Sequence, residues 1–109
     1  MDYGVTSMVA PLRRVAVRPP APASDFAKAH WAQPLDVDLL LTQHAQFVVI
    51  LQGLGCDVAV LPPLEGLPDS CFVYDPAFVV ADGVIQLRAA KPVRVGEPER
   101  LCADLEALG

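Results

Sequence analysis

The densest group of polar residues lies in the segment 68–76, which reads PDSCFVYDP. Two carboxylates, Asp69 and Asp75, flank an apolar stretch that we predict to be a strand. Side chains an even number of residues apart lie on the same face of a strand, so both carboxylates would face one pocket. A guanidinium group is planar and offers a fixed fork of donors that carboxylates match with paired hydrogen bonds. The pair therefore indicates a cradle for a guanidinium.

A second polar group, in the segment 88–97, follows a predicted hairpin and reads RAAKPVRVGE. An arginine of such a loop could bind a carboxylate, for example that of an amino-acid substrate. Both groups have an ordinary alternative. Aspartates such as Asp69 and Asp75 often stabilise turns, and a loop rich in Arg and Lys is often simply solvated. From spacing alone these alternatives are the more common case.

No cysteine is indicated as a nucleophile, because a catalytic thiol needs a base within hydrogen-bond reach. We expect Cys56 and Cys71 in buried strands and Cys102 on the apolar side of the last helix, all packed as small hydrophobes. His44 falls on the apolar side of a predicted helix, and His30 lies in a proline-rich loop. The three widely spaced cysteines, without a CxxC motif, argue against a disulfide framework or zinc site, and we predict no cofactor.

The composition excludes several classes of partner. The chain has 109 residues, a net charge of −5 and only eight Lys and Arg residues, which argues against binding nucleic acid. No apolar run is long enough to span a membrane, and the start, Met1–Gly4, does not read as a secretory signal, so we predict a cytoplasmic protein. The 53% of hydrophobic residues indicates surface that more chain or a partner subunit covers.

The order of predicted elements is strand, helix, strand, hairpin and helix, which indicates an α/β fold. The long loop 19–34 holds four prolines and is typical of a lid or binding loop. The predicted elements are a strand at 13–18, a helix at 36–54, strands at 56–61, 71–74, 77–81 and 84–88, and a helix from 97. Asp82-Gly83 is the hairpin signal.

The last predicted helix carries an apolar stripe at helical spacing, made of Leu101, Cys102, Leu105 and Leu108. No strand follows this helix to bury the stripe. We therefore expect an uncovered apolar face, and a single α/β unit that is incomplete.

The segment 61–63 (LPP), the segment 68–76 and the downstream Arg94 with Gly96-Glu97 resemble the dimethylarginine dimethylaminohydrolase family and its amidinotransferase-like relatives. The resemblance begins near Arg13 and points to the N-terminal part of such enzymes. It implies a pentein fold, a propeller-like ring of five ββαβ modules around a substrate channel. This chain would supply about two modules, 13–63 and 64–109, after a loose lead-in at 1–12, and would end without a closing strand.

The resemblance also implies roles for single residues. Asp69 and Asp75 would contact the substrate guanidinium, Arg94 would hold the substrate α-carboxylate, and Phe72 would belong to the same substrate-binding set. The ligand implied is an arginine-like small molecule, bound in the context of the full-length enzyme. Many relatives that hydrolyse methylated arginines have an acidic residue at the position of Tyr74, so arginine-deiminase-like and amidinotransferase-like chemistry remain open.

In the family, the catalytic cysteine and histidine belong to later modules, so the resemblance assigns no catalytic residue here. We expect a substrate-binding portion of a guanidine-modifying hydrolase or amidinotransferase that is inactive alone. The alternative is a non-catalytic interaction module that forms a homo-oligomer or pairs with a complementing chain. A third possibility is an unrelated small α/β binding domain.

Overall fold

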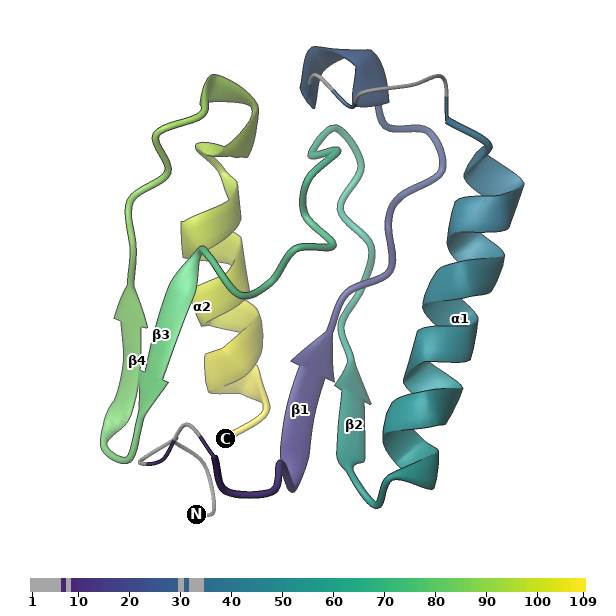
Figure 1. Ribbon diagram of the computed structural model, residues 1–109. Coiled ribbons are helices and arrows are strands. Elements are labelled where there is room, and N and C mark those ends of the chain that lie inside the picture. The colour runs from purple at the N-terminus through teal and green to yellow at the C-terminus, as the bar shows by residue number, and fades with distance from the viewer. Residues whose placement is uncertain (1–6, 8, 30, 32–34) are drawn as a thin grey trace.

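The computed structural model describes residues 7, 9–29, 31 and 35–109; the predicted lead-in at 1–12 and His30 lie largely or wholly outside these ranges. The fold is mixed α/β, as predicted. Two halves each combine a two-stranded sheet with one helix (Figure 1). No helix in the described ranges is long and apolar enough to cross a membrane. The elements are β1 (Arg14–Val17), η1 (Phe26–Ala29), α1 (Val37–Gly53), β2 (Asp57–Val60), β3 (Ala77–Val80), β4 (Gly83–Gln86), η2 (Pro92–Arg94) and α2 (Glu97–Ala107).

The first half pairs β1 with β2 in parallel, with Val15 opposite Val58. Parallel strands need a long crossover, and here the loop after β1 and the helix α1 provide it. The predicted helix start is confirmed, because the Asp36 carboxylate accepts a hydrogen bond from the backbone N–H of Leu39 at 3.0 Å. After the helix, Gly55 has φ +91°, a left-handed conformation that favours glycine and turns the chain into β2.

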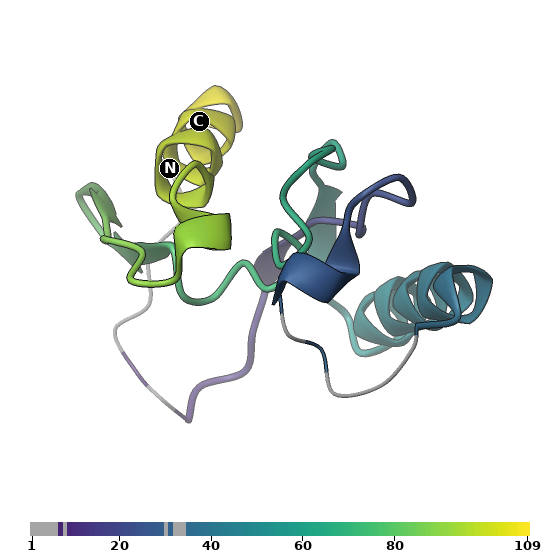
Figure 2. The ribbon, with the colours of Figure 1, turned by 90° about the horizontal axis from the view of Figure 1, so that it is seen from above.

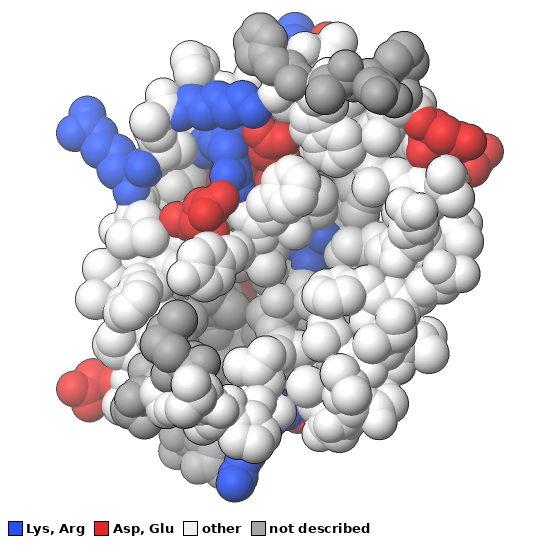
Figure 3. All heavy atoms as spheres, in the orientation of Figure 1, with Lys and Arg blue, Asp and Glu red and all other residues white. Residues whose placement is uncertain are grey.

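One face of α1 packs toward the sheet and the other does not. The apolar side on which the sequence placed His44 is confirmed, because half-buried residues recur on that side at helical spacing. They are Leu40, Leu41, His44, Val48 and Leu51. The opposite side still carries large apolar residues. Figure 3 shows that the surface over most of α1 is uncharged. Nothing in the described part of the chain covers that side; its exposed apolar residues are Leu39, Val49 and Ile50.

The second half is an antiparallel hairpin covered by α2. The predicted hairpin of β3 and β4 is confirmed, but its two-residue turn is Ala81-Asp82, one residue earlier than the Asp82-Gly83 signal, and Val80 lies opposite Gly83. Leu101 and Cys102 of α2 are buried in a cluster with Ala77 of β3 and with Leu61. The expectation of an uncovered helix face is therefore wrong for these two residues, because the preceding hairpin already buries them.

The segment 71–74 was expected to be a strand, and this prediction is wrong. The chain forms successive turns here, with the backbone N–H of Ser70 bonded to Leu67 O and that of Phe72 bonded to Asp69 O, both at 3.0 Å. These local bonds satisfy backbone groups that a strand would have offered to a neighbour. The same-face argument for Asp69 and Asp75 fails with the strand.

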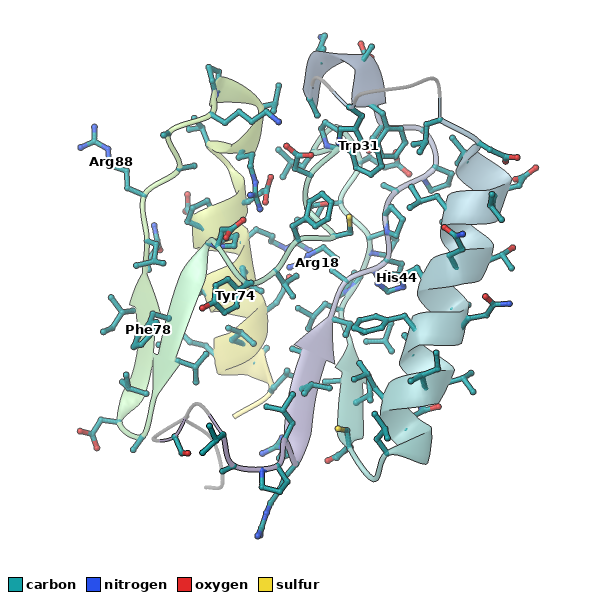
Figure 4. All side chains as sticks on the ribbon, viewed as in Figure 1. Arg18, Trp31, His44, Tyr74, Phe78 and Arg88 are labelled. Carbon is teal, nitrogen blue, oxygen red and sulfur yellow. The ribbon has the colours of Figure 1, made fainter. Side chains whose placement is uncertain are left out.

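Arg18 joins the two halves. Its side chain is 1% exposed, and it donates to the carbonyl of Pro62 at 2.6 Å and to the carboxylate of Asp104, on α2, at 2.7 Å. Figure 4 shows it at the end of β1, directed toward α2, and Figure 2 shows that α1 and α2 lie in separate halves of the molecule. A buried guanidinium needs such partners to offset its lost hydration. Arg18 thereby fixes how the second half sits against the first.

Candidate functional site

Arg94 is the centre of the polar network. It ends the short η2 turn, and the first residue of α2, Glu97, follows close behind. Its Nε and Nη2 donate to both oxygens of Glu97 at 2.8 to 3.1 Å. Its Nη1 donates to the Asp75 carboxylate and its Nη2 to the Phe72 carbonyl, both at 2.8 Å. The hydrogen bonds that Arg94 donates to Glu97 raise the pKa of Arg94 against the effect of burial, and the hydrogen bond to Asp75 raises it further.

Asp69 is the buried carboxylate of the site, with a residue exposure of 4%. One oxygen accepts the indole N–H of Trp31 at 2.8 Å, and the other accepts the ammonium of Lys91, also at 2.8 Å. Burial by itself raises the pKa of Asp69, but the hydrogen bonds from Lys91 and Trp31 and the nearby positive charges outweigh it. The net result is a lowered pKa, so the carboxylate is held ionised.

The Trp31 ring, which holds this carboxylate through its N–H, belongs to an aromatic cluster. The Trp31 ring lies 5.1 Å from that of Phe26 and 5.8 Å from that of Phe72, both tilted (Figure 4). The Lys91 ammonium also donates to the carbonyl of Ala29. Trp31 and Lys91 therefore attach the proline-rich loop to the second half at Asp69. Neither residue was predicted. Trp31 lies in the proline-rich loop 19–34, where no periodic pattern places a side chain, and the sequence around Lys91 suggested an ordinary basic loop.

The four predicted site residues lie around one network but differ in exposure. Asp69 is buried, the Arg94 side chain is 15% exposed, Phe72 is half-exposed, and the Asp75 side chain is 63% exposed. Arg94 links them, because it bonds Asp75 directly and approaches the backbone oxygens of Phe72 and Asp69. Arg94 thus contacts the carboxylate of Asp75 but only the backbone carbonyl of Asp69, whose carboxylate is held by Trp31 and Lys91.

The alternative of a solvated basic loop is wrong for Lys91 and Arg94, since both are half-buried and hold carboxylates. The solvated-loop alternative fits Arg88, which is exposed and points away from the other site residues in Figure 4.

A cleft of about 260 Å³ opens beside the network. Figure 3 shows Lys and Arg side chains gathered with Asp and Glu in this region of the surface. Lys91 and Arg94 line the cleft and also touch Asp69, whereas Asp69 and Phe72 are absent from its lining. The described residues lining the cleft are Asp75, Pro76, Arg88, Ala89, Ala90, Lys91, Arg94, Glu97 and Pro98.

Cys71 and Cys102 are poor nucleophiles in the folded chain. Burial, with the charges of Asp69 and Glu97 in support, raises the pKa of Cys71 to about 11, and burial also raises that of Cys102. Burial lowers the pKa of His44, which makes an edge contact with the ring of Phe47. Cys56 donates weakly to the carbonyl of Leu12. Within the described residues no hydrogen bond joins a cysteine to a histidine, and no group of three or more His, Cys, Asp or Glu residues is placed to hold a metal ion.

Comparison with known proteins places the chain beside one group of enzymes. It is 33% identical over 89 residues to an N(G),N(G)-dimethylarginine dimethylaminohydrolase of Pseudomonas aeruginosa, covering 80% of this chain and 35% of the relative. The enzyme of the same name from Mycobacterium tuberculosis is 29% identical over 101 residues, covering 89% of this chain and 33% of the relative. No protein-family model matches the chain.

The comparison with solved structures agrees with the comparison of sequences. The P. aeruginosa enzyme in complex with citrulline superposes with a TM-score of 0.74 at 27% identity, covering 89% of this chain and 38% of the other. The chain thus spans about a third of the length of the relatives that it matches. The resemblance that the motifs of the sequence indicated is confirmed in both sequence and fold, and it covers the N-terminal part of those relatives.

Proposed function

Because this chain is a relative of the dimethylarginine dimethylaminohydrolases, similar to their N-terminal part, we propose that it forms a binding site for the guanidino group of arginine or methylarginine. The reaction class that fits this site is hydrolysis of the guanidino group, or transfer of its amidino group. Asp69 and Asp75 take the guanidinium in this proposal. Citrulline, which the P. aeruginosa relative binds, has the same side-chain length and shape as arginine, which supports a ligand of this size.

The observation that carries the proposal is the environment of Asp69. This carboxylate is buried and ionised, and it accepts a hydrogen bond from Trp31, whose ring contacts that of Phe72. A planar guanidinium binds a carboxylate through paired donors and stacks on aromatic faces, so this surrounding suits it better than it suits a compact ammonium.

Asp75 and Arg94 complete the proposed contacts. The Asp75 carboxylate is largely exposed beside the cleft and bonds Arg94 through one oxygen, which leaves acceptor capacity for a second cation. Arg94 uses its Nε, both Nη2 hydrogens and one Nη1 hydrogen on partners in the described residues. Its second Nη1 hydrogen is left for the α-carboxylate of a ligand, and Phe72 supplies an apolar wall.

The proposal extends to the architecture. The two halves, 13–63 and 64–109, correspond in it to about two modules of a five-module pentein ring, with the loop 19–34 as a lid. The 109-residue chain alone is proposed to bind without turnover, since burial keeps Cys71 and Cys102 protonated and, within the described residues, no hydrogen bond joins a cysteine to a histidine. Incubation with arginine and Nω-methyl-L-arginine should yield no citrulline, amine or ammonia; formation of any of them would overturn the proposed inactivity.

Binding of Nω-methyl-L-arginine to the 109-residue chain, followed by calorimetry, tests the assignment of residues. Asp69→Asn and Asp75→Asn should each weaken binding, roughly tenfold or more, because each removes a charged partner of the cation. Asp82→Asn makes the same charge change on the exposed hairpin turn, away from the site, and should leave binding unchanged. Equal affinities for all three variants would refute the proposed site.

A second function, association with another chain, is favoured by the exposed apolar side of α1. Val49 is 65% exposed and Ile50 59%, and they adjoin each other on one helix. Exposed apolar patches of this kind often mark protein interfaces. Sedimentation velocity should then show a defined oligomer that Val49→Ser/Ile50→Ser converts to monomer. A monomeric unaltered chain would exclude self-association.

A further inference from the structure

Lys91 forms an ion pair with Asp69, the carboxylate that the proposed function assigns to the ligand. Its ammonium lies 2.8 Å from one oxygen of Asp69, while Trp31 holds the other oxygen. Both oxygens of a nearly inaccessible carboxylate are therefore engaged by the protein itself. A guanidinium that binds Asp69 with two donors has to replace one of these two partners.

The two partners differ in how easily they leave. The Lys91 side chain is 39% exposed, lines the cleft and sits on a flexible four-carbon stem. The Trp31 ring is packed between Phe26 and Phe72. Withdrawal of Lys91 exchanges one cation for another and keeps Asp69 paired, whereas withdrawal of Trp31 would dismantle the aromatic cluster. Lys91 is the partner that a cation entering from the cleft meets first.

We infer that Lys91 is an internal counterion of Asp69 that a guanidinium ligand must displace, and that it thereby sets both the affinity of the site and its preference for cationic ligands. This inference rests on the proposed function, because it concerns the same carboxylate. Burial works against the ionised form of Asp69, and a positive partner offsets that effect. In the unliganded chain Lys91 is that partner, and in the complex the ligand takes its place.

A neutral ligand cannot make this exchange. Citrulline has the length and shape of arginine but carries an uncharged ureido group, so displacing Lys91 for it would leave Asp69 without a cation. The site should therefore bind Nω-methyl-L-arginine more tightly than citrulline. Much of this difference in affinity should depend on Lys91.

The test measures binding of Nω-methyl-L-arginine to the unaltered 109-residue chain, to Lys91→Met and to Lys91→Arg. Lys91→Met removes the competing cation and should bind about tenfold more tightly. Lys91→Arg places a guanidinium of the protein itself on Asp69 and should bind more weakly than the unaltered chain. Citrulline should gain at least as much from Lys91→Met, so the preference for the cationic ligand should narrow. A second readout is the thermal midpoint: Lys91→Met should melt lower than the unaltered chain, and Nω-methyl-L-arginine should raise its Tm more than an equal concentration of NaCl does.

The outcomes separate the two proposals. If Asp69→Asn abolishes binding while Lys91→Met binds as tightly as the unaltered chain or less tightly, the role of Lys91 is refuted and the proposed function stands. If neither the unaltered chain nor Lys91→Met responds to Nω-methyl-L-arginine by calorimetry or by Tm, both the proposed function and this inference fall.

Discussion

Arg94 and Glu97 form a bidentate ion pair at the start of α2, with two guanidinium nitrogens on the two carboxylate oxygens and both side chains largely withdrawn from water. The Glu97 carboxylate also lies in the first turn of the helix, where a negative charge is favoured by the helix dipole. This pair anchors the loop that carries Lys91 to the helix that buries the second half's core.

Arg94→Ala should lower the free energy of unfolding by about 3 kcal/mol or more, because Glu97 would stay buried without a cation. Urea denaturation measures this loss. Arg100 also pairs with an acidic residue, Asp104, but half of the Arg100 side chain is in water and Asp104 keeps its bond to Arg18. Arg100→Ala is therefore the matched control and should cost less than about 1 kcal/mol. Equal losses for the two variants would contradict a structural role for the Arg94–Glu97 pair.

Arg18 offers a second stability test. Arg18→Met removes a buried guanidinium that holds Pro62 and Asp104, and should cost about 2 to 4 kcal/mol because their acceptors lose a buried charged donor. Arg14, four residues earlier, pairs with Asp57 at the surface, and Arg14→Met should cost less than about 1 kcal/mol. Comparable urea midpoints for both variants would show that Arg18 does not join the two halves.

The elements were largely predictable from the sequence, and the site only in part. Local signals fixed α1, with its Asp36 cap and apolar stripe, and the Asp-Gly hairpin, because caps and turns depend on neighbouring residues. The segment 71–74 has strand-forming residues, yet it turns because its backbone bonds close locally. The contacts of Trp31 and Lys91 with Asp69 span 38 and 22 residues, and no local pattern encodes such distances.

The burial of His44 gives stability a dependence on pH. Its pKa is lowered in the folded chain, so the unfolded chain binds more protons once the pH falls below the ordinary histidine value of about 6.5. Stability should therefore decrease as the pH falls through this range. His44→Gln should lack this part of the decrease, as measured by urea unfolding on either side of the ordinary value. If the free energy of unfolding changed with pH in the same way for the unaltered chain and for His44→Gln, this role of His44 would be contradicted.

The raised pKa of Cys71 predicts low thiol reactivity in the folded chain. With a pKa of about 11, little thiolate forms near neutral pH, and an unfolded cysteine with a pKa of about 8.5 forms far more. Alkylation by iodoacetamide, followed by mass spectrometry of the Cys71 peptide, should be slower in the native chain than in denaturant. Its native rate should keep rising above about pH 9. A native rate equal to that in denaturant would show an activated thiol.

The most direct measurement follows the indole N–H of Trp31, the chain's one tryptophan, which donates to Asp69. A ¹⁵N–¹H correlation spectrum gives this group a single resonance in a region of its own. Titration with Nω-methyl-L-arginine should shift that resonance saturably, and in Asp69→Asn the resonance should start elsewhere and no longer respond. A resonance that stays fixed in the unaltered chain, or that moves equally in Asp69→Asn, would contradict a guanidinium site at Asp69.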